Sequence, residues 1–317
     1  MPAVHLPQDR SVAREFAALA GDLEASGYDA LWAGEVNDID AVTAATLAAS
    51  ATTRAEIGLL LNTFTRAPAT LAMTAASLGH FAPGRVNIVL GSASPLLVAQ
   101  WNGIPYKRPA ARLADVLRFL RISLAGERVT DEFATFSANG FRLGTPLPEP
   151  PRLLVAACGP RALRLGSDEA DGVVLNWLTV DDLERIRPIP TDRARISLVV
   201  PVCPSPDVAV VDHTMRPVLA EYLGAPAYAD QQRRLGRGTA LQPMWEAWRA
   251  GDRGRAQAQV PFSVIDELVI HGSPRACSQQ LEDIERRSGV RAIATYFDVP
   301  GLSYREAAMA TDRSTNP

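Results

Sequence analysis

Polar and aromatic side chains stand directly after short apolar runs of this sequence, at points where strands would end. Glu35 follows ALWAG, Asn62 follows GLLL, and Asn176 follows GVVL with Trp177 next to it. In folds with parallel strands, the carboxyl ends of the strands meet on one side and carry the site. There a carboxylate could accept a proton or orient a bound ring, and an amide could contact a substrate. A structural ion pair is the alternative for Glu35.

A turn made of small residues follows the apolar run 86–90. Ser92, Ala93 and Ser94 let the backbone approach a ligand closely and offer hydroxyl and N–H donors. Such donors suit a phosphate or the edge of a flavin ring. An ordinary tight turn between a strand and a helix, with serine as the N-cap, is the alternative interpretation.

A second turn, AACGPR, has the same arrangement after the run 153–157. The strand ends at Ala157, Cys158 and Gly159, and Pro160 opens a helix with Arg161 beside it. Proline in the first helical turn leaves neighbouring backbone donors free to hold an anion, and Arg161 could add a bidentate phosphate contact. A helix start with Gly-Pro is common, so this motif alone is weak.

Apolar runs alternate with helical patterns along the chain. Eight strands are predicted at 4–6, 30–33, 57–61, 86–90, 153–157, 172–175, 196–202 and 291–297. Helices are predicted at 11–26, 41–52, 69–81, 112–124 and 181–186, with a long, largely helical segment over 212–288. Continuous apolar runs are typical of parallel strands covered on both sides. This series predicts an α/β fold, a closed (β/α)8 TIM barrel, with an open doubly wound sheet as the alternative.

The whole chain, 1–317, is predicted to be one barrel domain. Two insertions interrupt the strand–helix rhythm, after strand four at about 127–150 and after strand seven at about 203–262. A short polar tail covers 311–317. No linker rich in proline, glycine or serine divides the sequence.

Composition argues against several classes of protein. The 32 basic and 35 acidic residues give a net charge of -3, which does not favour nucleic acid or an anionic membrane. No stretch approaches the roughly 20 apolar residues of a membrane span. The three cysteines, Cys158, Cys203 and Cys277, lie far apart, so neither disulfides nor zinc are expected and the reducing cytoplasm fits best. The four histidines have no metal-binding spacing, so no metal is expected.

Several of these segments together resemble one known group of proteins. The matching stretches are ALWAGEVNDID, GLLLNTFTRAPATLAMTAASL, GRVNIVLGSASP, WNGIPYKRPAARLADVLRFLRISLAGE, LLVAACGPRALRLGSDEADGVVLNWLT and IHGSPRACSQQLEDIERRSGV, which cover about two thirds of the chain in order. The sequence resembles the luciferase-like monooxygenase superfamily, and within it the coenzyme F420-dependent oxidoreductases of the LLM class.

The resemblance implies a bacterial luciferase-like barrel with a cofactor ring at the strand ends. It places the ring against a bulge in strand three, near Leu59 and Leu60. It also places the ribityl and phosphate part at the two small-residue turns. The cofactor-binding residues implied are Leu59, Leu60, Asn62, Ser92, Ala93, Ser94, Ala157, Cys158, Gly159, Arg161 and Asn176.

The leading functional prediction is an oxidoreductase that passes a hydride between reduced F420 and a small organic substrate. Glu35 would orient the ring or its proton partner, while Asn176 and Trp177 would line the substrate side. The resemblance also implies a homodimer.

Two alternatives remain open. One is an FMN-dependent monooxygenase that uses oxygen and needs a reductase partner. The other is a non-catalytic flavin-binding barrel. It is kept open because Val36 stands where many deazaflavin enzymes carry a histidine, and because Ile57 and Leu59 stand where relatives often show glycines.

Overall fold

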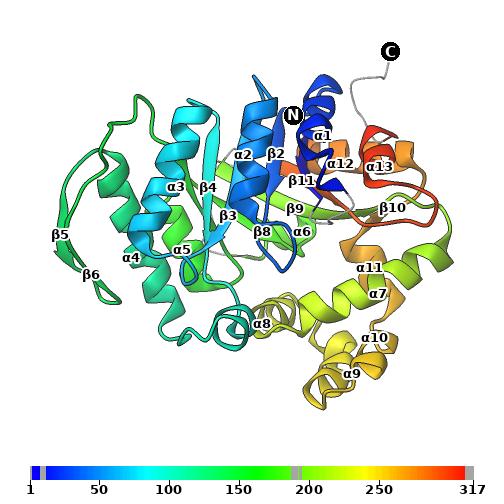
Figure 1. The fold of residues 1–317 in the computed structure, drawn as a ribbon. Coiled ribbons are helices and arrows are strands. Elements are labelled where there is room, and N and C mark those ends of the chain that lie inside the picture. The colour runs from blue at the N-terminus through cyan, green and yellow to red at the C-terminus, as the bar shows by residue number, and fades with distance from the viewer. Residues whose placement is uncertain (1, 8–11, 187–191, 193–194, 311–317) are drawn as a thin grey trace. The chain divides into compact units, whose positions relative to one another are not determined.

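The computed structural model describes residues 2–7, 12–186, 192 and 195–310, and its chain path is shown in Figure 1. Two compact units can be distinguished. The first comprises Met1–Ala157 with Arg161–Val174, and the second comprises Cys158–Pro160 with Leu175–Pro317. The predicted start of the first helix at Ser11 and the polar tail 311–317 lie outside the described residues.

The first unit is a parallel sheet with helices between its strands. Its strands are β1 (Ala3–His5), β2 (Ala30–Ala33), β3 (Glu56–Asn62), β4 (Val86–Gly91), β7 (Arg152–Ala156) and the first part of β8 (Gly172–Asn176). Each pairs in parallel with the next in this order. The connecting helices are α1 (Phe16–Ala25), α2 (Ala41–Ala51), α3 (Pro68–Phe81), α4 (Pro109–Leu124) and α5, which begins at Pro160 and ends at Asp168.

Small side chains let the helices of this unit pack closely on its sheet. Helix α2 buries five alanines, and α2 and α3 lie side by side along β2, β3 and β4 (Figure 1). Asp40 begins α2 by accepting a hydrogen bond from the Thr43 backbone N–H at 2.8 Å. Pro68 and Pro109 occupy the first turns of α3 and α4, where proline has no hydrogen bond to lose.

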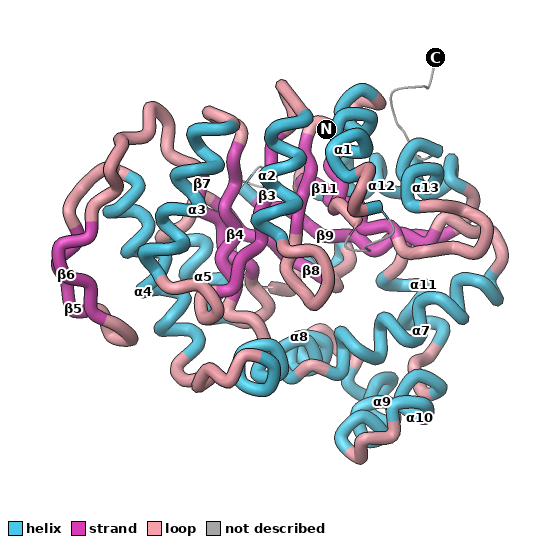
Figure 2. Tube along the Cα trace, in the orientation of Figure 1, coloured by secondary structure: helices cyan, strands magenta, loops and turns pink. Residues whose placement is uncertain are grey.

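Three elements of the first unit were not predicted. A π-helix, η2 (Leu96–Trp101), follows the β4 turn, and an antiparallel hairpin of β5 (Val129–Glu132) and β6 (Ser137–Phe141) lies within the predicted insertion 127–150. Figure 2 shows this hairpin apart from the other strands. Its outward strand residues are largely exposed, so the apolar signal that marks the other strands is weak here.

The second unit combines three strands with most of the helices. Strand β9 (Ile196–Cys203) pairs in parallel with β10 (Ile270–His271) and with β11 (Arg291–Tyr296). The helices are α6 (Val180–Leu183), α7 (Val208–Gly224), α8 (Pro226–Arg234), α9 (Gly238–Arg249), α10 (Arg253–Ala258), α11 (Phe262–Leu268), α12 (Pro274–Ser288) and α13 (Tyr304–Ala310). Helices α7 to α11 share one apolar cluster that includes Met215, Leu241 and Trp245.

The sheet has the strand order β10-β9-β11-β1-β2-β3-β4-β7-β8, with an additional pairing of β9 with β8. Apart from the two-residue β10, these are the eight predicted strands, each with its predicted core in place. The cyclic parallel order is that of a (β/α)8 barrel. The predicted fold class is confirmed, and the open-sheet alternative is wrong. The single-domain description stays a prediction.

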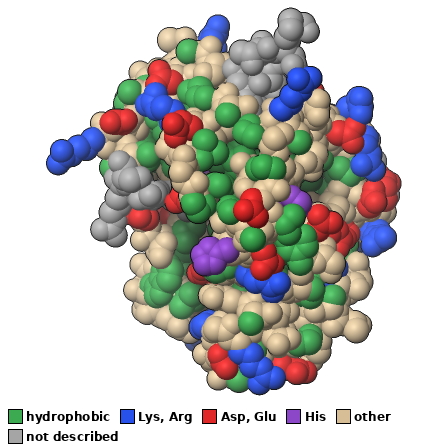
Figure 3. Space-filling model, turned by 90° about the vertical axis from the view of Figure 1, so that its right-hand side faces the viewer, with side chains coloured by type: hydrophobic (Ala, Val, Ile, Leu, Met, Phe, Trp, Pro, Cys, Tyr) green, Lys and Arg blue, Asp and Glu red, His purple; other side chains and the backbone are tan. Residues whose placement is uncertain are grey.

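The described part of the chain contains no helix long and apolar enough to cross a membrane. Figure 3 shows one face of the molecule, on which acidic and basic side chains are interspersed among hydrophobic ones. This mixture agrees with the small net charge of -3.

A glycine in β3 makes room for the tryptophan of β2. Gly58 lies directly opposite Trp32 in the parallel register. A Cβ atom at position 58 would lie 2.2 Å from two carbon atoms of the Trp32 indole. Because Trp32 is only 4 % exposed, its ring has little freedom to move away. The pair therefore fixes how β2 and β3 pack.

We expect the Gly58→Ala change to destabilise the protein by about 1–3 kcal/mol, because it over-packs a buried ring. The free energy of unfolding in urea would measure this. Gly144→Ala is the matched control, because a Cβ at Gly144 would meet nothing within 4 Å. Equal stabilities of the two variants would contradict this account of the Trp32–Gly58 packing.

Candidate functional site

The acidic residue at the end of β2 is held by an ion pair. Glu35 Oε1 pairs with Arg66, and Arg66 also pairs with Asp40, which caps α2. Glu35 Oε2 accepts a hydrogen bond from Asn62 Nδ2 at 3.3 Å. The structural ion pair considered for Glu35 is therefore present. The structure also brings the predicted pair Glu35 and Asn62 together.

Asn62 fixes the turn that leaves β3. Its Oδ1 accepts hydrogen bonds from the backbone N–H groups of Phe64, at 3.0 Å, and Thr65, at 2.8 Å. These two donors identify the oxygen end of the amide, so the nitrogen end faces Glu35. Asn62 is 6 % exposed. The carboxylate and the amide thus form one rigid polar group at the carboxyl ends of β2 and β3.

The two leucines predicted to meet a cofactor ring lie on opposite faces of β3. Leu59 is fully buried, like Ile57 and Leu61 on the same face. Leu60 is half-buried, and a Cβ at Gly91 of β4 would lie 3.7 Å from its Cδ1. Leu60 could therefore offer its side chain to a flat ligand, whereas Leu59 could offer its backbone.

The turn after β4 is tight and made of small residues, as predicted. Ser92, Ala93 and Ser94 are all half-buried, and Ala93 has a positive φ of 54°. Tyr106 Oη donates a hydrogen bond to the Ala93 carbonyl at 3.1 Å, and Ser94 Oγ accepts one from the Leu97 N–H at 3.3 Å. The turn is thus held in its left-handed shape by a side chain.

The turn after β7 is open on one side. A Cβ at Gly159 would meet no atom closer than Arg234 Nη2 at 4.0 Å. The same guanidinium donates to the Cys158 carbonyl at 2.7 Å. Ala157 is 2 % exposed, and Arg161 is exposed in the first turn of α5. Gly159 therefore leaves space for a ligand to approach the backbone.

Burial raises the pKa of the Cys158 thiol to about 11, although a hydrogen bond from Tyr228 and the charge of Arg234 act to lower it. The thiol is therefore neutral at physiological pH. This agrees with the interpretation of Cys158 as a small packing group and not a nucleophile.

The strand β8 ends in an irregular turn at the two residues predicted to line the substrate side. Asn176 Oδ1 accepts a hydrogen bond from the Trp177 N–H at 2.9 Å, and Trp177 has a positive φ of 58°. The Trp177 indole is 2 % exposed within the apolar cluster of the second unit, 5.0 Å from the Tyr222 ring. Asn176 is half-buried. Asn176 is thus the more accessible of the two.

Two buried glutamines of α8 hold this turn, and sequence reasoning missed them. Gln231 Nε2 donates to the Asn176 carbonyl and Gln232 Nε2 to the Trp177 carbonyl, each at 2.8 Å. They are 3 % and 0 % exposed. The stretch QQRR at the end of α8 is polar throughout, so its sequence indicates a solvated helix end. The two carbonyls that these amides satisfy belong to the irregular turn at the end of β8.

The buried Arg237 holds Gln232 in place. We call Gln231 and Gln232, which bind the turn at the end of β8, the glutamine clamp. Arg237 donates to Gln232 Oε1 at 2.9 Å, to Asp182 at 2.6 Å and to Glu267 at 2.6 Å. Burial acts to lower the pKa of Arg237, but the hydrogen bonds to Glu267 and Asp182 outweigh it and raise that pKa. Asp182 also forms a capping box with Thr179 at the start of α6. The end of β8 is thereby tied to α6, α8 and α11.

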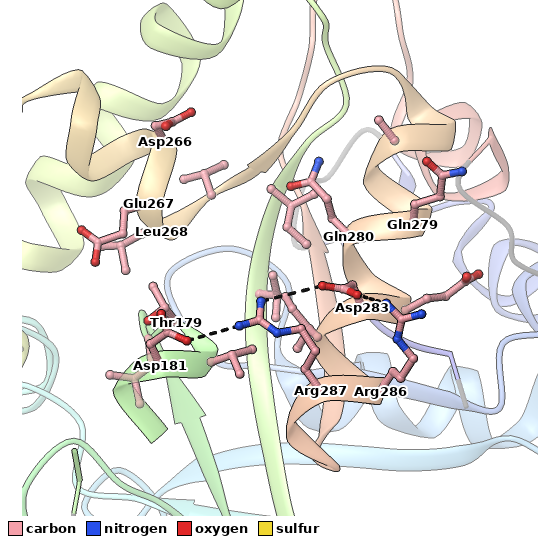
Figure 4. Close-up of a pocket in the computed structure, with 18 residues that line it drawn as sticks. Thr179, Asp181, Asp266, Glu267, Leu268, Gln279, Gln280, Asp283, Arg286 and Arg287 are labelled. Carbon is pink, nitrogen blue, oxygen red and sulfur yellow. Dashed lines mark hydrogen bonds and ion pairs between the residues drawn. The ribbon is translucent and has the colours of Figure 1, made fainter. Parts of the chain in front are cut away.

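A groove of about 790 Å³ lies elsewhere in the second unit, between α6, α11 and α12. Its arginines are paired with its acids: Arg287 lies between Asp181 and Asp283, and Arg286 pairs with Asp283 (Figure 4). None of the predicted site residues lines this groove. Within residues 2–7, 12–186, 192 and 195–310, no group of three or more His, Cys, Asp or Glu side chains could hold a metal ion.

A family model described as luciferase-like monooxygenase matches residues 2–292. The chain belongs to this family. The predicted family is confirmed by a match that spans both compact units.

Two named relatives are similar to this chain in sequence. A Mycobacterium tuberculosis protein provisionally named coenzyme F420-dependent oxidoreductase is 24 % identical over 295 residues, which cover 81 % of this chain and 83 % of that protein. The F420-dependent glucose-6-phosphate dehydrogenase of Beutenbergia cavernae is 34 % identical over 132 residues, 40 % of this chain and 39 % of that enzyme.

A solved structure agrees in fold. The coenzyme F420-dependent tetrahydromethanopterin reductase of Methanopyrus kandleri has a TM-score of 0.80 and 21 % identity, and the match covers 98 % of this chain and 97 % of that chain. These relatives are oxidoreductases by name, and the predicted enzyme class is confirmed.

We expect the Arg237→Ala change to cost about 3–5 kcal/mol of stability, because it leaves the fully buried Asp182 carboxylate without its main partner. Urea unfolding would measure the loss. Arg286→Ala is the control: its side chain is 79 % exposed, so its pair with Asp283 should contribute less than about 1 kcal/mol. Comparable losses in the two variants would show that the Arg237 network does not anchor the clamp.

We also expect iodoacetamide to modify one of the three thiols of the native protein. Cys203 and Cys277 are 0 % exposed, whereas Cys158 is half-buried. The thiolate is the reactive form, and the pKa of Cys158 is raised to about 11, so the rate should keep rising between pH 8 and about 11. Mass spectrometry would locate the adduct, with Cys158→Ser as the control. A rate that levels off near pH 9 would be evidence against the burial of this thiol.

Proposed function

We propose that this protein is an oxidoreductase that uses coenzyme F420 to transfer a hydride to or from a small organic substrate. The open glycine turn at Gly159, combined with the family match, carries the proposal. The relatives named for F420 dependence supply the cofactor identity.

The residues of this chain fit a flat ring with a phosphorylated tail. Leu60 offers a half-buried apolar side chain beside Gly91, where a ring could rest. The turn at Ser92, Ala93 and Ser94 is small and half-buried, and the turn at Gly159 has free space above its backbone. The residues proposed to hold the cofactor are Leu59, Leu60, Asn62, Ser92, Ala93, Ser94, Ala157, Cys158, Gly159, Arg161 and Asn176.

A bound 5-deazaflavin supplies the hydride chemistry, and the protein supplies orientation and electrostatics. Glu35 acts here through Asn62, because its carboxylate is engaged by Arg66 and by the Asn62 amide. We therefore assign it a positioning role at the carboxyl ends of β2 and β3. Asn176 is proposed to contact the substrate, with its carbonyl held by Gln231.

Trp177, which is buried in the core, is proposed to position the neighbouring Asn176. Its left-handed backbone and buried indole fix the direction in which the neighbouring Asn176 side chain points. The cytoplasmic location and the homodimer stay predictions.

Titration of the purified protein with F420 and with FMN tests the proposal. We expect F420 to bind and FMN to bind at least about tenfold more weakly, as followed by the cofactor's own absorbance and fluorescence. Tight FMN binding without F420 binding would favour the monooxygenase alternative. Failure of both to bind would reject a flavin-type cofactor for this barrel.

In the same titration, Gly159→Val should weaken F420 binding at least about tenfold, or about 1.4 kcal/mol. The Cβ position is open, because its nearest neighbour is Arg234 Nη2 at 4.0 Å, so the added side chain should obstruct the ligand more than the fold. Gly144→Val, in an exposed loop with nothing within 4 Å, should bind F420 as the unchanged protein does. Unchanged F420 affinity in Gly159→Val would show that the cofactor phosphate does not bind at this turn.

A further inference from the structure

Three polar side chains from three different elements meet in the second unit. Cys158 belongs to the turn after β7, Asn176 ends β8, and Tyr228 lies in α8. Asn176 Nδ2 donates a hydrogen bond to Tyr228 Oη at 3.5 Å, and the Cys158 thiol lies close enough to the Tyr228 hydroxyl for each group to influence the pKa of the other. All three residues are half-buried, so each keeps some solvent-accessible surface.

The two donors of this group, Asn176 Nδ2 and Tyr228 Oη, have only weak hydrogen-bonding partners in the protein. The Asn176–Tyr228 distance of 3.5 Å is at the outer limit of a hydrogen bond. The Cys158 thiol beside the Tyr228 hydroxyl is only a weak acceptor. An oxygen atom placed near Asn176 Nδ2 and Tyr228 Oη would be a better acceptor for both donors.

The orientation of these donors is fixed by the protein. Asn176 Oδ1 accepts the Trp177 N–H, so the nitrogen end of the amide must face Tyr228. Gln231 holds the carbonyl of Asn176 from behind. The Tyr228 ring lies edge-on to the Tyr222 ring, with centroids 6.1 Å apart. A ligand would therefore find the two donors already in place.

The protonation and surroundings of the group indicate the kind of ligand. Burial and the neighbouring Cys158 and Tyr222 raise the pKa of Tyr228 well above 10, so its hydroxyl stays protonated and remains a donor at neutral pH. The nearby cation, Arg234, is engaged by the Cys158 carbonyl. Aromatic rings of Tyr222 and Tyr228 flank the donors. Neutral donors beside aromatic surface suit an uncharged oxygen compound better than an anion.

We propose that Asn176 Nδ2 and Tyr228 Oη form a subsite that binds the carbonyl oxygen of a neutral organic substrate with an apolar body. The hydroxyl oxygen of the corresponding alcohol would occupy the same place. The identification of this ligand as the hydride partner rests on the proposed function. The subsite itself rests on the geometry of Asn176, Tyr228 and Cys158.

Cyclohexanone is a suitable probe, and the Cys158 thiol beside Tyr228 is a suitable reporter. The rate of iodoacetamide modification of Cys158 is measured at pH 9 over a range of ketone concentrations, in the full-length protein without cofactor. Each variant is compared with its own unprotected rate. The matched pair is Tyr228→Phe, which removes the proposed donor, and Tyr222→Phe, which removes a hydroxyl from the adjacent ring and keeps the aromatic surface.

We expect the ketone to slow the modification of Cys158 in the unchanged protein and in Tyr222→Phe. Tyr228→Phe should require at least about fivefold more ketone for the same protection, because one hydrogen bond is lost. Cyclohexanecarboxylate, the anionic analogue, should protect less well than cyclohexanone. Unchanged protection in Tyr228→Phe, or better protection by the carboxylate, would overturn the subsite.

The F420 titration separates the two proposals. Protection by the ketone without F420 binding would support the subsite and reject the cofactor assignment. F420 binding with no protection by the ketone at any concentration up to its solubility would reject the subsite and leave the cofactor assignment in place. Circular dichroism of both tyrosine variants checks that folding is retained.

Discussion

The buried ion pair between Arg237 and Asp182 is the contact on which the end of β8 depends. Asp182 is fully buried and Arg237 is 6 % exposed, so each charge needs the other. Arg237 orients the Gln232 amide, and Gln232 satisfies the carbonyl of Trp177. Without these partners a left-handed tryptophan would leave a buried polar group unpaired. The irregular turn that aims Asn176 is therefore maintained from a distance, by helices that follow it in the chain.

The two compact units hold their candidate site residues in different ways. In the first unit, Glu35, Asn62 and Arg66 fix one another through side-chain contacts close to the strands that carry them. In the second unit, the Asn176 backbone is held by Gln231 from helix α8. The first arrangement is local to the strand ends. The second depends on helix α8, which lies in the segment between β9 and β10.

The strands could be predicted because each carries its own apolar signal, as in Ile57–Leu61 or Val86–Leu90, and parallel strands covered on both sides leave that signal uninterrupted. The polar residues at their ends were found for the same reason. The hairpin β5–β6 could not be predicted from the sequence, because its exposed residues show no apolar pattern. Gln231 and Gln232 were missed because their partners lie about 55 residues earlier, and no local pattern records so distant a pairing.

Trp32 and Gly58 have a consequence for how this sequence can change over generations. The indole occupies the volume that a side chain at position 58 would need. A larger residue at 58 becomes tolerable only after the residue at 32 has become smaller, and shrinking it first leaves a void. The two positions should therefore covary among descendants of this chain. Either both residues stay as they are, or position 32 becomes small and position 58 becomes large.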